Sequence, residues 1–205
     1  MISAHRCARE FVAHLAHAIL LVAPTILLVD LRSIGWKIGC FTLMTMVAAA
    51  LESRLVARHL PSGWESIEDP LAMRVAAMVG IGLLAVFWSA QIERVICAPA
   101  PGAHTLSMIG VAVMFTGIVL RVVAIRTLGP SFVSDIRCSG IYIQTGVYAW
   151  LRHPAEIGML LLAIGAPMLL MAPRTALAAA LLLGPVSVWR MRREDALLLH
   201  RVETS

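Results

Sequence analysis

Charged residues are scarce in this chain. Only 14% of its 205 residues are charged and 60% are hydrophobic, whereas a soluble domain has about a quarter charged residues. The mean hydropathy of +0.85 reflects the same imbalance. The composition argues against a water-soluble fold and favours one compact domain in a membrane.

The sequence also lacks the usual signs of a metal site, a disulfide framework or a nucleic-acid interface. Its four cysteines are far apart and include no C-x-x-C pair, so neither zinc binding nor a disulfide framework is indicated and no metal is expected. The formal net charge is +5, but the basic residues are dispersed among hydrophobic blocks. They form no basic face with aromatic partners, so no nucleic-acid partner is expected.

Long apolar segments are what the sequence does contain, and they predict an all-α fold, an integral membrane helical bundle. A helix needs about 20 apolar residues to cross a bilayer core. The last two segments are short and are separated by Pro173 and Arg174, so they are expected to form a C-terminal helical hairpin. Six transmembrane helices are predicted, with five as the alternative, at about 11–29, 34–51, 71–92, 105–125, 156–172 and 174–189.

Lys and Arg residues are unevenly distributed around the ends of these segments. With six spans both termini lie on one side, and that side collects most of the basic residues, including those around Arg126 and Arg190. Cytoplasmic connections are enriched in Lys and Arg. The sequence therefore predicts a multi-pass protein with both termini, and the long connection 126–155, in the cytoplasm.

Two polar features near the first four spans have ordinary interpretations. Arg121 lies near the end of a predicted span, where its stem can extend to the interface, so a structural role is expected ahead of a catalytic one. Residues 52–70 contain Glu52, Pro61 and Gly63 and are interpreted as a solvated loop. No chemistry is assigned to this loop.

A different kind of pattern occupies the last third of the chain. Residues 128–132 read LGPSF, and residues 146–158 read GVYAWLRHPAEIG, which contains a G-x-Y-x-x-x-R-H-P motif with a glycine four residues beyond the proline. After the predicted hairpin, residues 190–195 read RMRRED, an R-x-x-x-E-D motif. An R-H-P tripeptide alone would be weak, but the ordered combination is specific.

This combination resembles the isoprenylcysteine carboxyl methyltransferase and phospholipid methyltransferase superfamily of membrane enzymes. The resemblance begins at Leu128, and the first four spans match only as hydrophobic helices. It implies one membrane domain over 1–205, with four spans in 1–125 and a methyltransferase-like cofactor-binding part in 126–205. The implied cofactor is S-adenosylmethionine, and the implied partner is a lipid or prenylated acceptor from the bilayer. Catalysis is assigned to Glu156 and Arg152, and cofactor binding to His153, Tyr148, Gly158, Glu194 and Arg190.

The residues themselves support a site at one end of the hairpin. Pro154 fits the first turn of a helix, whose free backbone N–H groups favour a bound carboxylate near His153. The second hairpin helix returns to the same face, so Glu194 and Asp195 are expected to approach His153. The alternative is an interfacial belt around Trp150 with Arg190 and Glu194 as an i,i+4 surface pair.

The acceptor is the least determined part of the prediction. Glu156 stands where the family usually has an aromatic residue, and no G-x-x-Y-x-x-Y-like tail follows the acidic pair before Ser205. A prenylcysteine carboxylate needs no base, because α-carboxyl groups ionise with a pKa of about 3.3–3.7. An amine must lose a proton, which Glu156 or Glu194 could accept. Isoprenylcysteine methylation is therefore the leading interpretation, with phospholipid-amine or small-thiol methylation and a non-enzymatic membrane protein as alternatives.

Overall fold

The computed structural model describes residues 4–28, 35–59, 70–97, 102–129 and 145–204, and all regular structure within these ranges is helical. This confirms the predicted all-α class and the presence of six long helices. A short 3-10 helix, η3 (Gly146–Ala149), precedes the last two. The α-helices are α1 (Ala4–Leu28), α2 (Trp36–His59), α3 (Pro70–Ile96), α4 (Ala103–Leu128), α5 (Pro154–Leu169) and α6 (Pro173–Thr204).

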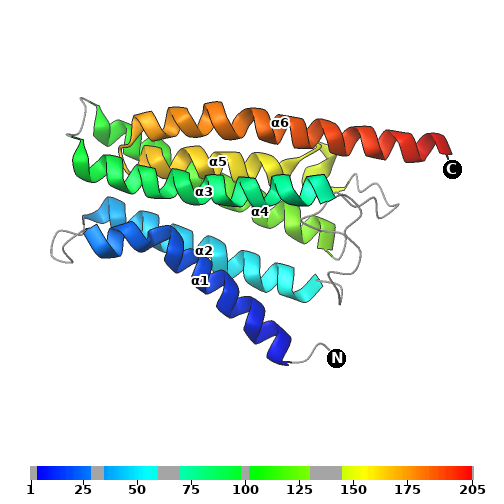
Figure 1. The fold of residues 1–205 in the computed structure, drawn as a ribbon, viewed down its shortest axis with the longest axis horizontal. Helices are drawn as coiled ribbons and strands as arrows, with labels where there is room; N and C mark the ends of the chain where they lie inside the picture. The colour runs from blue at the N-terminus through cyan, green and yellow to red at the C-terminus, as the bar shows by residue number, and fades with distance from the viewer. Residues whose placement is uncertain (1–3, 29–34, 60–69, 98–101, 130–144, 205) are drawn as a thin grey trace.

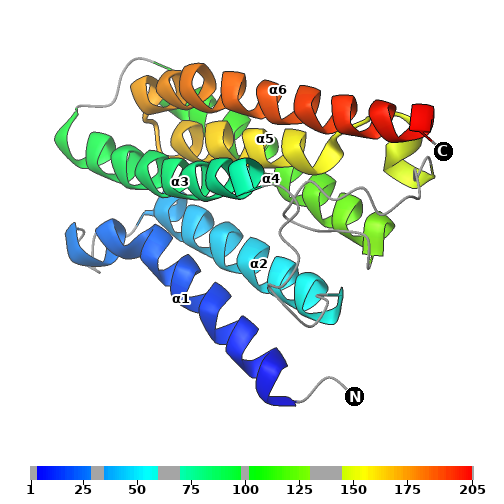
Figure 2. The same cartoon turned by 45° about the vertical axis from the view of Figure 1, so that its right-hand side comes forward.

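The six helices alternate in direction along one long axis (Figure 1). Helices α3 to α6 form the thicker part of the bundle, and α1 and α2 pack beside it (Figures 1 and 2). A tight turn joins α5 to α6, as the predicted hairpin requires. The start of α1, the start of α5 and the end of α6 lie at the same end, here called the site end. The starts of α2 and α6 and the end of α3 lie at the other, here called the far end (Figure 1).

Three helices are long and apolar enough to cross a membrane, over Trp36–Leu55, Ala77–Ile96 and His104–Leu128. The apolar part of α1 and the whole of α5 are shorter. Large apolar side chains also face outward, since Leu27 is 80% exposed and Ile81 and Leu182 are each 68% exposed. The chain is thus an integral membrane protein, and the number of times that the other three helices cross the bilayer remains a prediction.

Helices α4 and α5 approach each other closely because glycines line their contact. A Cβ atom added at Gly110 would lie 2.2 Å from the backbone nitrogen of Leu169, and one at Gly117 would lie 2.8 Å from the carbonyl oxygen of Gly158. Gly165 meets the backbone of Met114 in the same way. Small residues allow such close packing in membranes, where lipid provides little hydrophobic drive for helix association. This glycine seam fixes α5 on α4.

Helix α1 is attached to α3 by hydrogen bonds that the side chains of Trp88 and the buried Gln91 make with the backbone around Pro24. Proline has no N–H group and leaves the carbonyl of Leu20 without its helical donor, and the indole of Trp88 donates to that carbonyl at 2.8 Å. The Gln91 side chain accepts from the backbone N–H of Thr25 at 2.8 Å and donates to the carbonyl of Leu21 at 2.8 Å. Two residues of α3 thus replace the hydrogen bonds that the proline disrupts in α1.

Candidate functional site

The site end of α5 is organised by two backbone features, of which the sequence predicts the first. Pro154 occupies the first turn of α5 and His153 is its N-cap residue, as expected from the fixed φ angle of proline and its missing N–H group. Gly146 begins η3 with a φ of 59°, in the left-handed region that glycine adopts without steric cost. Together these residues turn the chain into α5 and direct His153 towards α6.

His153 lies between two carboxylates of α6. Its Nδ1 atom is 3.3 Å from Glu194 Oε2 and its Nε2 atom is 3.2 Å from Asp195 Oδ1. Both ring nitrogens can donate only when the imidazole is protonated. The hydrogen bond with Glu194 is the main factor that raises the pKa of His153 above its ordinary value of 6.5; Asp195 raises it further, and burial opposes the shift. We conclude that the expected approach of Glu194 and Asp195 to His153 is present.

Tyr148 and Arg152 border this cluster in different ways. Burial raises the pKa of the Tyr148 phenol, and the nearby Glu194 carboxylate adds to the shift. Tyr148 is therefore a neutral hydroxyl donor at physiological pH. Arg152 is 65% exposed on its side chain, and its Nη1 atom lies 3.6 Å from Asp195 Oδ2. Trp150 is 89% exposed, so it contributes to the outer surface.

A second pair of charges lies one turn further into α5. The Nη1 atom of Arg190 donates to Glu156 Oε2 at 3.2 Å, and the two side chains are 18% and 14% exposed. The other oxygen of Glu156 and the Nε atom of Arg190 are buried and have no hydrogen-bond partner. Arg190 therefore does not form the i,i+4 surface pair with Glu194 that the sequence allowed. This pair leaves one acceptor and one donor available to a ligand.

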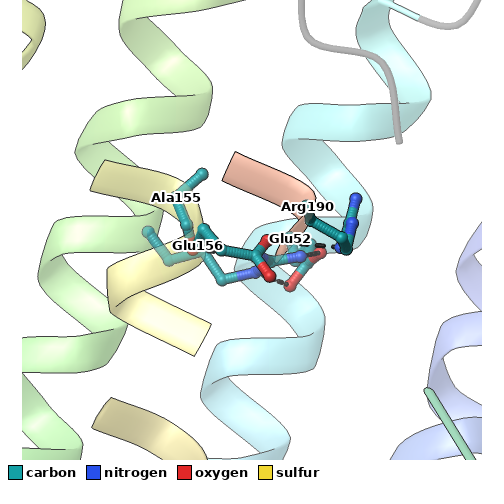
Figure 3. Close-up of polar contacts among 5 residues, drawn as sticks. Glu52, Ala155, Glu156 and Arg190 are labelled. Carbon is teal, nitrogen blue, oxygen red and sulfur yellow. Dashed lines mark hydrogen bonds and ion pairs between the residues drawn. The ribbon is translucent and has the colours of Figure 1, made fainter. Parts of the chain in front are cut away.

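A third pair joins α2 to the site and was missed at the sequence level. Arg121 Nε donates to Glu52 Oε2 at 2.9 Å and its Nη2 to Oε1 at 2.5 Å, while its Nη1 donates to the carbonyl of Ala155 at 3.3 Å. Glu156 acts on Arg121 electrostatically. Figure 3 shows Glu52, Glu156 and Arg190 converging from three different helices.

The interpretation of Glu52 as part of a solvated loop was therefore wrong, because α2 continues to His59 and carries this residue into the bundle. The rest of that predicted loop, residues 60–69, lies outside the described residues. The signal was present in the sequence: Glu52 directly follows an apolar run and no helix breaker occurs before Pro61. A helical extension of that run would have placed Glu52 on a buried face.

Gly158 and the segment after Leu128 are the remaining parts of the predicted site. Gly158 lies in the glycine seam, where an added Cβ would be 2.8 Å from the Gly117 carbonyl oxygen. Its observed contacts are thus with α4, and its predicted contact with a cofactor remains a prediction. Residues 130–144, including most of the LGPSF segment, lie outside the described residues.

A shallow hollow lies beside the Glu52–Arg121 pair, between α2, α4 and α5. Apart from those two residues its lining is apolar, so a hydrophobic surface lies beside one charged pair. The lining residues are Ala48, Glu52, Ile118, Arg121, Val122, Ile125 and Leu162.

The described residues contain no group of three or more potential metal ligands from His, Cys, Asp and Glu. The site contains cation–carboxylate contacts in which Arg121, Arg152, His153 and Arg190 meet carboxylates of α2, α5 and α6. Such a set can bind a ligand that carries charges of both signs, because each carboxylate and each cation offers a partner to the opposite charge.

Comparison with known proteins gives consistent matches for this part of the chain. The Isoprenylcysteine carboxyl methyltransferase (ICMT) family matches residues 108–200. A protein-S-isoprenylcysteine O-methyltransferase of Tribolium castaneum is 39% identical over 74 residues, which are 34% of this chain and 26% of that protein. The Saccharomyces cerevisiae protein of the same name is 29% identical over 98 residues, 46% of this chain and 41% of that protein.

A similarity of fold extends over nearly the whole chain. The solved structure of the eukaryotic intramembrane Ras methyltransferase ICMT has a TM-score of 0.54 and 24% sequence identity, and the match covers 95% of this chain and 68% of that one. The curated relatives are matched over less than half of their own length. The sequence similarity to isoprenylcysteine carboxyl methyltransferases is thus concentrated in residues 108–200 of this chain.

Proposed function

We propose that this chain is an S-adenosylmethionine-dependent methyltransferase that acts on the carboxylate of a prenylated or similarly lipophilic acceptor at the membrane. The observation that carries the proposal is the convergence of His153, Glu194 and Glu156 at one end of the α5–α6 hairpin. The names of the matched relatives support the reaction class.

The residues at the site fit the proposed cofactor. S-adenosylmethionine carries a carboxylate, an ammonium and a sulfonium, and it supplies an electrophilic methyl group when bound. The unpartnered Nε of Arg190 is a buried donor for the carboxylate of the cofactor, and the unpartnered oxygen of Glu156 is a buried acceptor facing the reacting groups. His153, Tyr148, Glu194 and Arg190 would hold the cofactor, together with the free N–H groups of the first turn of α5.

The Glu156–Arg190 pair favours a carboxylate acceptor over an amine. An amine acceptor would need a base, and a proton taken up by Glu156 would weaken its ion pair with Arg190 at 3.2 Å. A carboxylate is already ionised near neutral pH and needs no base. The work of the protein is then to align the reacting groups and to exclude water, and Glu156 contributes by position and charge.

The hollow beside Arg121 suggests how the acceptor could approach. The hollow is too small to hold a lipid tail, but its lining from α2, α4 and α5 places an apolar surface directly beside the charged Glu52–Arg121 pair. A lipophilic acceptor would enter sideways from the bilayer, and the polar cofactor would enter from the aqueous side. With both termini in the cytoplasm, as the distribution of Lys and Arg predicts, that aqueous side is the cytoplasm.

Cofactor binding tests the proposal directly. Titration calorimetry in nanodiscs should detect binding of S-adenosylmethionine or its demethylated product. We expect His153→Ala and Glu194→Ala to weaken it by about 1–3 kcal/mol each, the range for a hydrogen bond that involves a charged group. Arg192→Gln is the matched control, because this α6 residue is exposed. Unchanged binding in both site variants would show that the proposed site is misplaced.

A further inference from the structure

The far end of the bundle carries three cations with few acceptors. Lys37 lies in the first turn of α2, Arg94 in the last turn of α3 and Arg174 in the first turn of α6. Lys37 and Arg94 are close enough to repel each other. We call Lys37, Arg94 and Arg174 the far-end cations.

The carboxylate of Glu93, which precedes Arg94 in α3, is already engaged. Glu93 accepts from the backbone N–H of Arg174 at 3.2 Å, and from the backbone N–H and hydroxyl of Thr175 at 2.8 and 2.6 Å. It thereby satisfies donors at the start of α6, where a helix leaves N–H groups free. Among the described residues no ion pair forms at this end, in contrast to the site end.

The observed partners of the far-end cations are weak acceptors. Lys37 Nζ donates to the thioether sulfur of Met171 at 2.7 Å, and Arg174 Nη1 lies 4.0 Å from the sulfur of Cys97. Thioether and thiol sulfur accept hydrogen bonds poorly. The Nη1 atom of Arg94 is buried and has no hydrogen-bond partner. A buried donor in this state destabilises the fold unless an acceptor from outside the chain meets it.

The surroundings of these cations match the boundary of a membrane. Val95 and Ile96, next to Arg94 on α3, are 51% and 74% exposed. Trp36 is 49% exposed, and Lys37 Nζ lies 5.8 Å from the centroid of its ring. Exposed Trp residues are enriched where membrane spans meet the headgroup region. An acceptor at this place would therefore have acyl chains directly beside it.

We propose that the far-end cations bind the phosphate of an anionic phospholipid in the leaflet opposite the proposed catalytic site. The phosphate oxygens would accept from Arg94 Nη1 and Lys37 Nζ, and the acyl chains would lie along the exposed apolar surface of α3. Basic pockets between membrane helices bind anionic lipid headgroups in this manner. The site is independent of the methyltransferase proposal, since none of its residues belongs to the site end.

The test compares the whole chain in nanodiscs of phosphatidylcholine with and without phosphatidylglycerol. We expect phosphatidylglycerol to raise the melting temperature and to stay bound during detergent extraction, as measured by native mass spectrometry. Arg94→Gln and Lys37→Gln should each weaken retention about fivefold, the factor for one cation at an anionic lipid surface. Arg126→Gln is the matched control, because Arg126 is an exposed cation in the last turn of α4, which ends near the start of α5.

Three results would overturn the lipid site. The first is equal stabilisation by both lipid compositions, and the second is equal retention of phosphatidylglycerol in wild type and in Lys37→Gln. Lys37→Gln is decisive if Arg94→Gln does not fold, because Lys37 is partly exposed. The third is an equal melting shift caused by inorganic phosphate in lipid-free detergent, which would indicate a site for a free anion.

Discussion

Helix α5 contacts its two neighbours by different means. Towards α4 it presents Gly158 and Gly165, and the two backbones meet directly, with Arg121 of α4 donating to the carbonyl of Ala155 at the site end of this contact. Towards α6, at the site end, it presents His153 and Glu156, which pair with charged side chains. The first contact is mainly backbone against backbone, whereas the second consists of ionised groups that a ligand can engage. The difference indicates that α4 supports the site and that α6 completes it.

The largest expected effect comes from breaking the glycine seam. Gly110→Leu would place a side chain against the backbone of Leu169, which cannot move aside as a flexible side chain could. We expect a loss of about 3 kcal/mol or more in the free energy of unfolding, at the upper end of the range for overpacking. Gly184→Ala in α6 is the control, since an added Cβ there meets nothing within 4 Å, and it should be neutral or stabilising. Similar free energies of unfolding for the two variants would contradict the claim that α4 and α5 need glycine at their contact.

The neutral polar contact between α1 and α3 should contribute a stability between that of the glycine seam and that of the α5–α6 ion pair. Gln91→Leu removes the partners of the Thr25 N–H group and the Leu21 carbonyl, both buried beside Pro24. Leaving such groups unsatisfied costs about 1–3 kcal/mol, which unfolding in denaturant would measure. Thr45→Val serves as the control, because the Thr45 hydroxyl is buried without a hydrogen-bond partner and its removal should change little. A larger loss in the control would show that the Gln91 contacts are not what holds α1.

The contact between α5 and α6 can be measured as a coupling energy. Glu156→Gln and Arg190→Gln, singly and together, form a double-mutant cycle for the 3.2 Å pair. We expect a coupling of about 1–2 kcal/mol, because the side chains are mostly buried but each retains an unpaired atom. Kinetically, Glu156→Gln should change turnover or acceptor preference more than cofactor affinity. Additive effects of the two substitutions on stability would mean that the pair does not link the helices.

The smallest effect should be a pH dependence that belongs to the α5–α6 contact alone. The raised pKa of His153 means that the folded state holds the proton more tightly than the unfolded state. The resulting stabilisation is complete below the unfolded value of about 6.5 and is lost as the pH rises through the higher folded value. The melting temperature should fall more between about pH 6 and about pH 9 in wild type than in His153→Gln. A steeper fall of the melting temperature in His153→Gln than in wild type would contradict a raised pKa of His153 in the folded state.

The hairpin and its first turn could be predicted because their signals are local. Pro154 marks the start of α5, and two apolar segments around Pro173 require a return of the chain, so the approach of Glu194 to His153 follows from short-range rules. The contacts of Gly158 could not be predicted in the same way. They depend on the position of α4, and the sequence contains no signal for which helix faces which.

The Glu52–Arg121 pair shows the same limit more clearly. Its members are 69 residues apart and lie on the different helices α2 and α4, so local rules treat each as an isolated charge. Arg121 was expected to have a structural role, and its contacts with Glu52 and Ala155 agree with that expectation. That this pair borders the site became evident only when the packing of α2 against α4 was known.

Methyl transfer itself is the most direct test of the proposed function. Purified protein in nanodiscs would receive S-adenosylmethionine with a labelled methyl group, together with an amine-blocked S-farnesylcysteine and phosphatidylethanolamine in the same reaction. We predict label in a base-labile methyl ester of the farnesylcysteine carboxylate and none in the phospholipid headgroup, with the signal reduced in His153→Ala and in Glu194→Ala. Label in the headgroup, or no transfer by protein that binds the cofactor, would contradict the proposed carboxyl methyltransferase activity.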